Sequence, residues 1–299
     1  MSNLDPNDNS FTWYAPTFGG FFYDLKRDLG TETLKFTLSG DTTNRLSGDD
    51  PRGIIYETRT QSKAFERGLW GSYKVIGFLG ERYFAGYNEG ASEEDGYHIF
   101  SIFFKESTDK NSLSSEQLQK ILMDSKDEII VKRDTPLRLA EGYELDIKAI
   151  DTSGMYLELT KNGQVIDSKV ISPSKIGATV VDKTYWYKNP AVGDQKNLVT
   201  IGVHFKNAKN IQNQTFATVV GIWQISETPT EVKADTQYDK MRIATVDAYN
   251  GVITMDNKDN AITLSKNKDT ILMPGVNIRT ADNDTLRFYI YSEENCECG

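Results

Sequence analysis

Apolar and polar residues alternate with a period of two through most of the chain. Leu34, Phe36 and Leu38, for example, are separated by Lys35 and Thr37. Successive side chains of a β-strand point to opposite faces of a sheet, so this alternation predicts strands with one buried face. Further strands are predicted over residues 53–56, 73–79, 98–104, 143–149, 155–160, 198–205, 218–225, 241–246 and 286–291.

Turn-forming residues separate these segments. Clusters of Gly, Asn and Asp recur at intervals of roughly 8–12 residues, a spacing typical of sandwiches and barrels. Asn162-Gly163 tolerates the positive φ angles of a tight hairpin turn, and the strand pattern resumes after it at Val165. The sequence therefore predicts an all-β fold.

One short helix is predicted within this all-β pattern. Ser114 and Gln117 have the spacing of a capping box. Leu118, Ile121 and Leu122 follow at the i, i+3, i+4 spacing of an apolar helical stripe. We expect a surface helix that ends at about residue 123.

The strands group into two predicted β-sandwich subdomains joined by short linkers. Residues 127–228 hold about as many strands as one β-sandwich contains. The segment 227–239 is polar and contains Pro229, which predicts a linker. Residues 240–292 are too few for a core of their own, so we expect them to complete a discontinuous sandwich begun by residues 10–126. The middle subdomain would then be an insertion.

The charge balance argues against nucleic acid as a partner. The chain has 34 Lys and Arg against 43 Asp and Glu, a net charge of −9. No dense basic patch stands out, and phosphate binding depends on such patches. An acidic surface repels anions and attracts cations.

Neither a disulfide framework nor a membrane anchor is predicted. The two cysteines, Cys296 and Cys298, lie in the last four residues, where we expect a disordered tail, with intermolecular pairing as the alternative. No run approaches the ~18 apolar residues that a transmembrane helix needs. The first nine residues are polar and do not resemble a signal peptide.

No catalytic, cofactor or metal site is predicted. The two histidines, His98 and His204, lie in aromatic-rich strands without a nucleophile motif, so both are interpreted as structural. No His/Cys spacing fits zinc. The acidic loops 93–95, 256–260 and 282–284 are candidates for calcium but are more simply solvated turns. The prediction is a protein that is not an enzyme and needs no cofactor.

Two N-glycosylation sequons are present. They are Asn213-Gln214-Thr215 and Asn283-Asp284-Thr285, each in a polar stretch that we expect to be exposed. N-glycosylation at these sequons is expected only if the protein is extracellular. Asn213 and Asn283 are therefore the candidate attachment sites for an N-linked glycan.

The chain resembles a known family in two long stretches. They are TPLRLAEGYELDIKAIDTSGMYLELTKNGQVIDSKVI, from Thr135, and ATVDAYNGVITMDNKDNAITLSKNKDTILMPGVNIRTADNDTLRFYIY, from Ala244. With the aromatic start at residues 11–23, they are similar to the S-layer family duplication domain of methanogenic archaea. The resemblance covers residues 11–292. Its most distinctive parts are Gly142-Tyr143 and the block from Leu272 to Phe288.

The resemblance implies a function and a location. Members of that family carry tandem domains, each of two β-sandwich subdomains, whose copies pack laterally into a porous lattice around the cell. It implies an extracellular structural subunit whose partner is itself, with no catalytic residues. Family members also carry a signal peptide and a membrane anchor; neither is found here, so we expect one repeat of a longer protein. If Glu93, Glu94 and Asp95 line the pores, the lattice would retard anions.

Two other function classes are left open by the sequence. An extracellular carbohydrate-binding or adhesive β-sandwich is the first, because tryptophan rings can stack on sugars. The four tryptophans are Trp13, Trp70, Trp186 and Trp223. A hydrolase is the second, and it requires measurable turnover.

Overall fold

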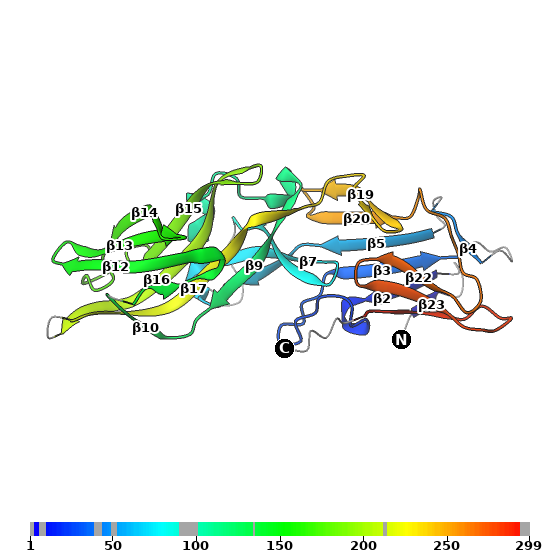
Figure 1. The fold of residues 1–299 in the computed structure, drawn as a ribbon, viewed down its shortest axis with the longest axis horizontal. Coiled ribbons are helices and arrows are strands. Elements are labelled where there is room, and N and C mark those ends of the chain that lie inside the picture. The colour runs from blue at the N-terminus through cyan, green and yellow to red at the C-terminus, as the bar shows by residue number, and fades with distance from the viewer. Residues whose placement is uncertain are drawn as a thin grey trace.

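The chain forms an elongated molecule of antiparallel β-sheets (Figure 1). The computed structural model describes residues 3–5, 10–38, 44–48, 53–89, 101–133, 135–211 and 214–293. Every pair of strands that it describes is antiparallel, and the all-β prediction is confirmed.

A β-sandwich forms one end of the molecule, on the right of Figure 1. Alternate residues of its larger sheet, such as Leu34, Phe36 and Tyr56, pack against Leu272 and Ile278 of the smaller one and form the first core. The seven-stranded sheet runs in the order β1 (Asn3–Asp5), β2 (Ser10–Tyr14), β3 (Glu32–Thr37), β5 (Gly53–Arg59), β20 (Val252–Asp256), β19 (Met241–Asp247) and β18 (Gln237–Tyr238). The three-stranded sheet contains β22 (Asp269–Met273), β23 (Val276–Thr280) and β24 (Phe288–Tyr291), and β4 (Arg45–Leu46) pairs with β21 (Ile262–Thr263).

An eight-stranded sheet runs from the middle of the molecule to the opposite end. Its order is β15 (Thr184–Val192), β16 (Gln195–Ile211), β17 (Gln214–Glu231), β9 (Gln117–Ser125), β8 (Glu81–Tyr87), β7 (Ser72–Phe78) and β6 (Gln61–Ala64), with β10 (Ile129–Lys132) also paired to β17. A four-stranded sheet packs on it through a second core and contains β11 (Leu137–Arg138), β12 (Tyr143–Asp151), β13 (Gly154–Lys161) and β14 (Gln164–Ile171).

A third core lies within the eight-stranded sheet and is rich in aromatic residues. Trp70, Tyr73 and Phe84 come from the part around β7 and β8, and Trp223 comes from β17. These side chains meet only because the sheet curves back on itself. The short helices of the described chain lie between strands: α1 (Ile102–Glu106) and the 3-10 turns η1 (Ala15–Thr17), η2 (Gly68–Trp70), η4 (Ser112–Ser115) and η5 (Ala140–Gly142).

The predicted subdomains share this eight-stranded sheet. Strands β6, β7 and β8 belong to the predicted first subdomain, and β15, β16 and β17 to the predicted insertion. Strand β9 pairs with β8 on one side and with β17 on the other. The first residues of the predicted linker, 227–231, are the end of β17 and pair with β9. The division into two subdomains stays a prediction.

The helix predicted from Ser114 to about residue 123 is wrong. A single 3-10 turn ends at Glu116, whose φ is 50°, and strand β9 follows. The apolar spacing misled because β9 has buried residues on both faces: Leu118 packs in the first core and Ile121 against the third. Cross-strand pairing with β8 and β17 outweighs the local helical pattern.

The α-helix lies where a strand was predicted. Residues 102–104 of the predicted strand 98–104 belong to α1, and residues 98–100 lie outside the described part. Phe103 is fully buried and packs against Gly202 of β16, so burial of one ring places this single helical turn. The predicted hairpin at Asn162-Gly163 is confirmed, with φ angles of 49° and 81°.

Candidate functional site

Most of the predicted site residues lie outside the part of the chain that the structure describes. These are Glu93, Glu94, Asp95 and Asn213, and the same holds for both cysteines and His98. Asn283 is described and lies in an exposed turn, where its Oδ1 accepts a hydrogen bond from the Thr285 N–H at 2.9 Å. The structure therefore places one predicted sequon at the surface.

His204 has the structural role predicted for it. It is 2% exposed, and its Nδ1 lies 2.9 Å from the Thr184 hydroxyl while its Nε2 lies 3.2 Å from Arg67 Nη2. Burial, with the charges of Arg67 and Lys183, lowers the pKa of His204 to about 4. A neutral imidazole here joins the β6–β7 connection to strand β16.

The side chains of the acidic loop 256–260 contact residues of neighbouring strands. Asp256 and Asp259 both pair with Arg242 at about 3 Å, and Asn257 accepts a hydrogen bond from the Ile54 N–H at 2.8 Å. Among the described residues, no three His, Cys, Asp or Glu side chains are grouped closely enough to hold a metal ion. The side chains of this loop thus act as braces between β19, β20 and β5.

Several surface pockets occur in the described part of the chain. One of about 470 Å³ lies between the β12–β13 turn and the loop after β14. Its carboxylate, Asp151, accepts hydrogen bonds from Ser153 and Gly154 of its own turn. The acid is therefore engaged in turn formation.

The tryptophans offer little exposed ring surface. Trp70 and Trp223 are fully buried, and Trp13 is half-buried against Phe36 and Phe288. Trp186 is also half-buried, and the ammonium group of a neighbouring lysine lies 3.0 Å from its ring centre. This arrangement gives no support to a stacking platform for sugars.

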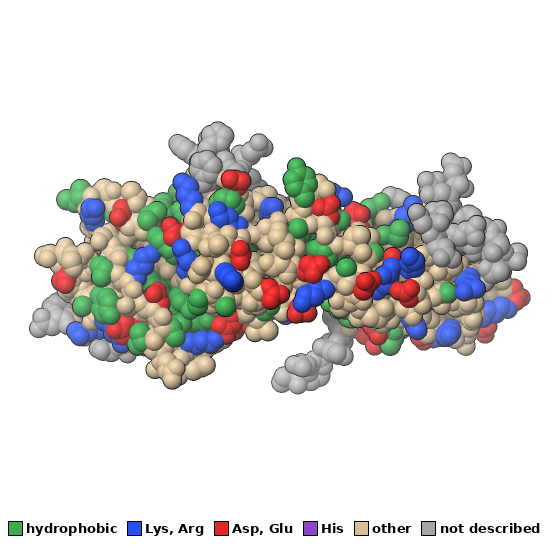
Figure 2. All heavy atoms as spheres, turned by 90° about the horizontal axis from the view of Figure 1, so that it is seen from above, with side chains coloured by type: hydrophobic (Ala, Val, Ile, Leu, Met, Phe, Trp, Pro, Cys, Tyr) green, Lys and Arg blue, Asp and Glu red, His purple; other side chains and the backbone are tan. Residues whose placement is uncertain are grey.

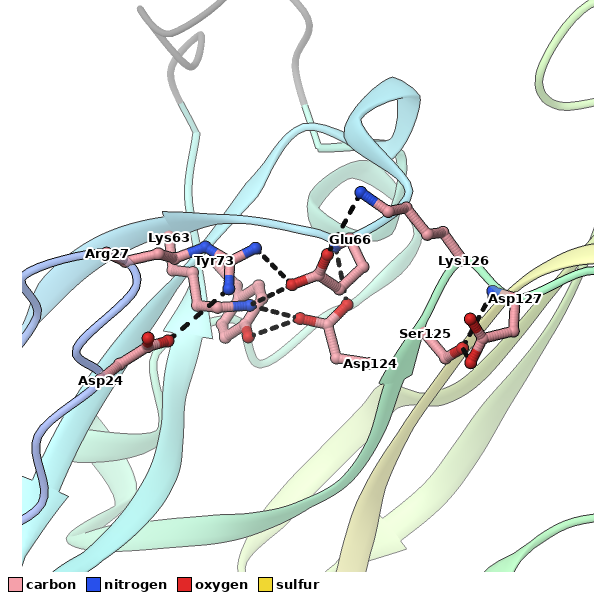
Figure 3. A network of polar contacts seen from close by, with 9 residues as sticks. All are labelled: Asp24, Arg27, Lys63, Glu66, Tyr73, Asp124, Ser125, Lys126 and Asp127. Carbon is pink, nitrogen blue, oxygen red and sulfur yellow. Dashed lines mark hydrogen bonds and ion pairs between the residues drawn. The ribbon is translucent and has the colours of Figure 1, made fainter.

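A buried polar network lies where β6, β7 and β9 meet (Figure 3). Lys63 Nζ lies 2.6 Å from Asp124 Oδ2, and each of the two side chains is 2% exposed. The Tyr73 hydroxyl donates to the same oxygen at 2.9 Å, and the Glu66 N–H donates to Oδ1 at 2.9 Å. A buried ion pair of this kind is stable only when the remaining hydrogen-bonding positions are also filled.

The network continues to the surface through Glu66 (Figure 3). Its carboxylate pairs with Arg27 and lies 3.8 Å from Lys63 and 3.7 Å from Lys126. Burial raises its pKa, but the hydrogen bond from Arg27 and the neighbouring positive charges outweigh it and hold that pKa below its ordinary value. Arg27 in turn pairs with Asp24, so the network ties the β2–β3 connection to the sheet.

Sequence reasoning missed this network, although a signal exists. Lys63 and Phe65 are two residues apart and both buried, so the lysine occupies an inward position of its strand. Glu32 precedes Leu34 and Phe36 in the same way and is 1% exposed. A charged residue in the buried register of an alternating segment predicts a buried polar contact.

The surface mixes charges of both signs with separate apolar side chains. Figure 2 shows Lys and Arg interspersed with Asp and Glu on one face of the molecule. Strands β13 and β14 also expose apolar side chains: Tyr156 pairs with Val170, and Val165 and Ile166 lie farther along β14, beyond the pair of Glu158 with Ser168. These four side chains, the β14 patch, are each at least 36% exposed. Tyr156 and Val170 are direct cross-strand partners, and neighbouring exposed apolar side chains of this kind are candidates for protein contacts.

Strand β14 is also an edge strand, since β13 is its only partner in the four-stranded sheet. Its inner face carries two charged residues: Asp167 accepts a hydrogen bond from Tyr185, and Lys169 covers Trp186. Inward charges on an edge oppose uncontrolled strand pairing.

In the described part of the chain, no helix is both long and apolar enough to cross a membrane.

The comparisons with known proteins agree with the sequence resemblance. A family model described as S-layer protein matches residues 3–282. The chain is 24% identical over 299 residues to the major S-layer protein of Methanosarcina mazei, covering 97% of this chain and 40% of that protein. It is 25% identical over 291 residues to that of Methanosarcina acetivorans, covering 94% and 39%.

The chain thus spans about two fifths of the length of the curated relatives that it matches. A major S-layer protein from Methanosarcina barkeri gives a similar match, 24% identical over 288 residues. Because the family model covers nearly the whole chain, and the relatives align along the same length, this protein belongs to the S-layer protein family.

Proposed function

We propose that this chain is a structural unit of an archaeal surface layer, exposed at the cell surface, whose copies assemble laterally into a porous lattice. The observation that carries the proposal is the family match over residues 3–282. The relatives are major S-layer proteins, and this chain aligns with them over nearly all of its own length.

The build of the molecule supports a load-bearing role. Strand β9 pairs with both β8 and β17, so one sheet continues between the middle and one end. The buried contact of Lys63 with Asp124 fastens the curved part of that sheet. A stiff unit transmits lateral force without bending, which a coat requires.

A structural role, without catalytic turnover, is part of the proposal. Its support is that the relatives are named as S-layer proteins and that the titratable groups at the buried sites engage one another. The adhesive alternative has less support, because two tryptophans are fully buried and two are half-covered.

Two further features are proposed for the assembled coat. Acidic residues, with Glu93, Glu94 and Asp95 as candidates, would line the pores and retard anions; the net charge of −9 supports this. If the permeability of the coat is independent of solute charge both before and after these residues are neutralised, the proposed role of the acidic residues is contradicted. Asn213 and Asn283 would carry N-linked glycans, which the exposed turn at Asn283 supports. Glycopeptide mass spectrometry of the coat tests both sites.

Immunogold electron microscopy of intact source cells tests the main proposal, with antibody raised against this chain. Dense, periodic label over the whole surface is the expected result. Sparse surface label would instead favour an adhesive or sugar-binding protein. Label confined to the cytoplasm would overturn the proposed location and function together.

A further inference from the structure

We propose that Lys63 and Asp124 join covalently after folding, in an intramolecular isopeptide bond between Nζ and Cγ, with Glu66 as the general base. The side chains are in hydrogen-bond contact at 2.6 Å and both are 2% exposed. The reaction concerns groups within one chain and does not rest on the proposed function. Lysine and aspartate need no activating cofactor when the protein itself holds them together.

The surrounding donors hold the Asp124 carboxyl group in one orientation. The Tyr73 hydroxyl donates to Oδ2 at 2.9 Å, and the Glu66 N–H donates to Oδ1 at 2.9 Å. The carboxyl group therefore cannot turn away from the amine, and Cγ stays beside Nζ. Holding two reacting groups in this way replaces an encounter in solution by an intramolecular step.

Aromatic side chains keep water from the pair. The Tyr73 ring centre lies 5.2 Å from Lys63 Nζ, and that ring packs on Phe65 at 4.8 Å and on Trp223 at 4.6 Å. In such surroundings, separate charges are costly. Moving one proton from Nζ to Oδ2 along their hydrogen bond gives a neutral amine and a neutral carboxylic acid, the two forms that react.

The step balances without an outside reagent. The Nζ lone pair forms a bond to Cγ, and the C=O electron pair moves onto Oδ1, which faces the Glu66 N–H. The Glu66 carboxylate lies 3.8 Å from Nζ, accepts one proton from the attacking nitrogen and returns it to Oδ2. The Cγ–Oδ2 bond breaks, one water molecule leaves, and the amide keeps the remaining Nζ proton.

The bond would close the curved sheet at the middle of the molecule. Lys63 lies on the edge strand β6 and Asp124 on β9, with β8 and β7 between them in the sheet. The link therefore ties an edge to the strand that also pairs with β17. Force applied along the sheet could not peel β6 away without breaking an amide.

Mass spectrometry of the purified, denatured wild-type chain tests the proposal. The expected mass is lower than that of the sequence by one water, about 18 Da. Trypsin should fail to cleave after Lys63, and a branched peptide should contain both Lys63 and Asp124. A mass equal to that of the sequence, with normal cleavage after Lys63, would overturn the proposal.

Variants separate the roles of the residues. Lys63→Arg and Glu66→Gln should both retain the full mass, the first because the amine is lost and the second because the base is lost. Lys126→Arg is the matched control, since it changes an exposed partner of Glu66 and should keep the lower mass. If all molecules of Glu66→Gln still lose one water, Glu66 is excluded as the base. A mass loss located at any other residue pair would overturn the assignment.

Discussion

The Tyr56 hydroxyl donates a hydrogen bond to the Glu32 carboxylate at 2.9 Å inside the first core. The N–H groups of Phe22 and Gly80 donate to the same carboxylate at 2.7 and 2.9 Å. Burial nevertheless dominates and raises the pKa of Glu32 from 4.5 to about 7. This acid therefore links the folding of the sandwich to pH.

Glu32 should make the fold less stable as pH rises from about 4.5 to about 7. In this range the unfolded chain has lost the proton that the folded chain keeps, so each rise in pH favours unfolding. The total loss is on the order of 3 kcal/mol. Chemical denaturation should show this fall in the unfolding free energy of wild type minus that of Glu32→Gln, a difference from which the opposite contribution of His204 cancels. The matched control, Glu57→Gln at a partly exposed position of the same sheet, should show the same fall relative to Glu32→Gln.

His204 should act in the opposite direction. The pKa of His204 is about 4 in the folded chain and 6.5 in the unfolded chain. Between these pH values only the unfolded chain binds the extra proton. Stability should rise by at most about 3 kcal/mol as pH increases from 4 to 6.5. His204→Gln retains hydrogen-bonding groups for Thr184 and Arg67 but cannot titrate. The difference in unfolding free energy between this variant and wild type should grow with pH; a constant difference would contradict the assignment.

Gly202→Ala should destabilise the third core. An added Cβ would lie 2.5 Å from the Phe103 ring, and the flanking strands hold the backbone in place. Overpacking of this kind costs roughly 1–3 kcal/mol. Thermal unfolding measures it, with Gly19→Ala as the control because nothing lies within 4 Å of an added Cβ there. Phe103→Leu should recover part of the loss in the double variant, and simple additivity would argue against this contact.

Val170→Glu should impair assembly without unfolding the chain. Val170 is 52% exposed in the β14 patch, so a charge there leaves the monomer within about 0.5 kcal/mol of wild type. If copies contact one another through this patch, a buried carboxylate would raise the concentration needed for lattice formation by roughly tenfold or more. Electron microscopy of reassembling protein measures this. Ile176→Glu, at a 99% exposed position outside the patch, should assemble normally. Equal assembly by both variants would remove β14 from the contact.

Much of the strand content was predictable because alternation is a local property. Leu34 and Phe36, or Leu157 and Leu159, lie two residues apart and face one core whatever the rest of the chain does. The Asn162-Gly163 turn was predictable for the same reason, since positive φ angles are a property of these residues. The two local errors, at 114–123 and 102–104, lie where both faces are buried or where one ring packs on a glycine.

By itself the sequence determined the all-β class, the positions of strands such as β3, β12 and β13, and the family, because each depends on residues close together in the chain or on long matched stretches. Only the tertiary structure decided that β9 joins two groups of strands and that Lys63 lies against Asp124. The two residues are on strands that are not neighbours, and curvature of the whole sheet brings them together. Contacts of that kind depend on the packing of every strand between them, which no local pattern records.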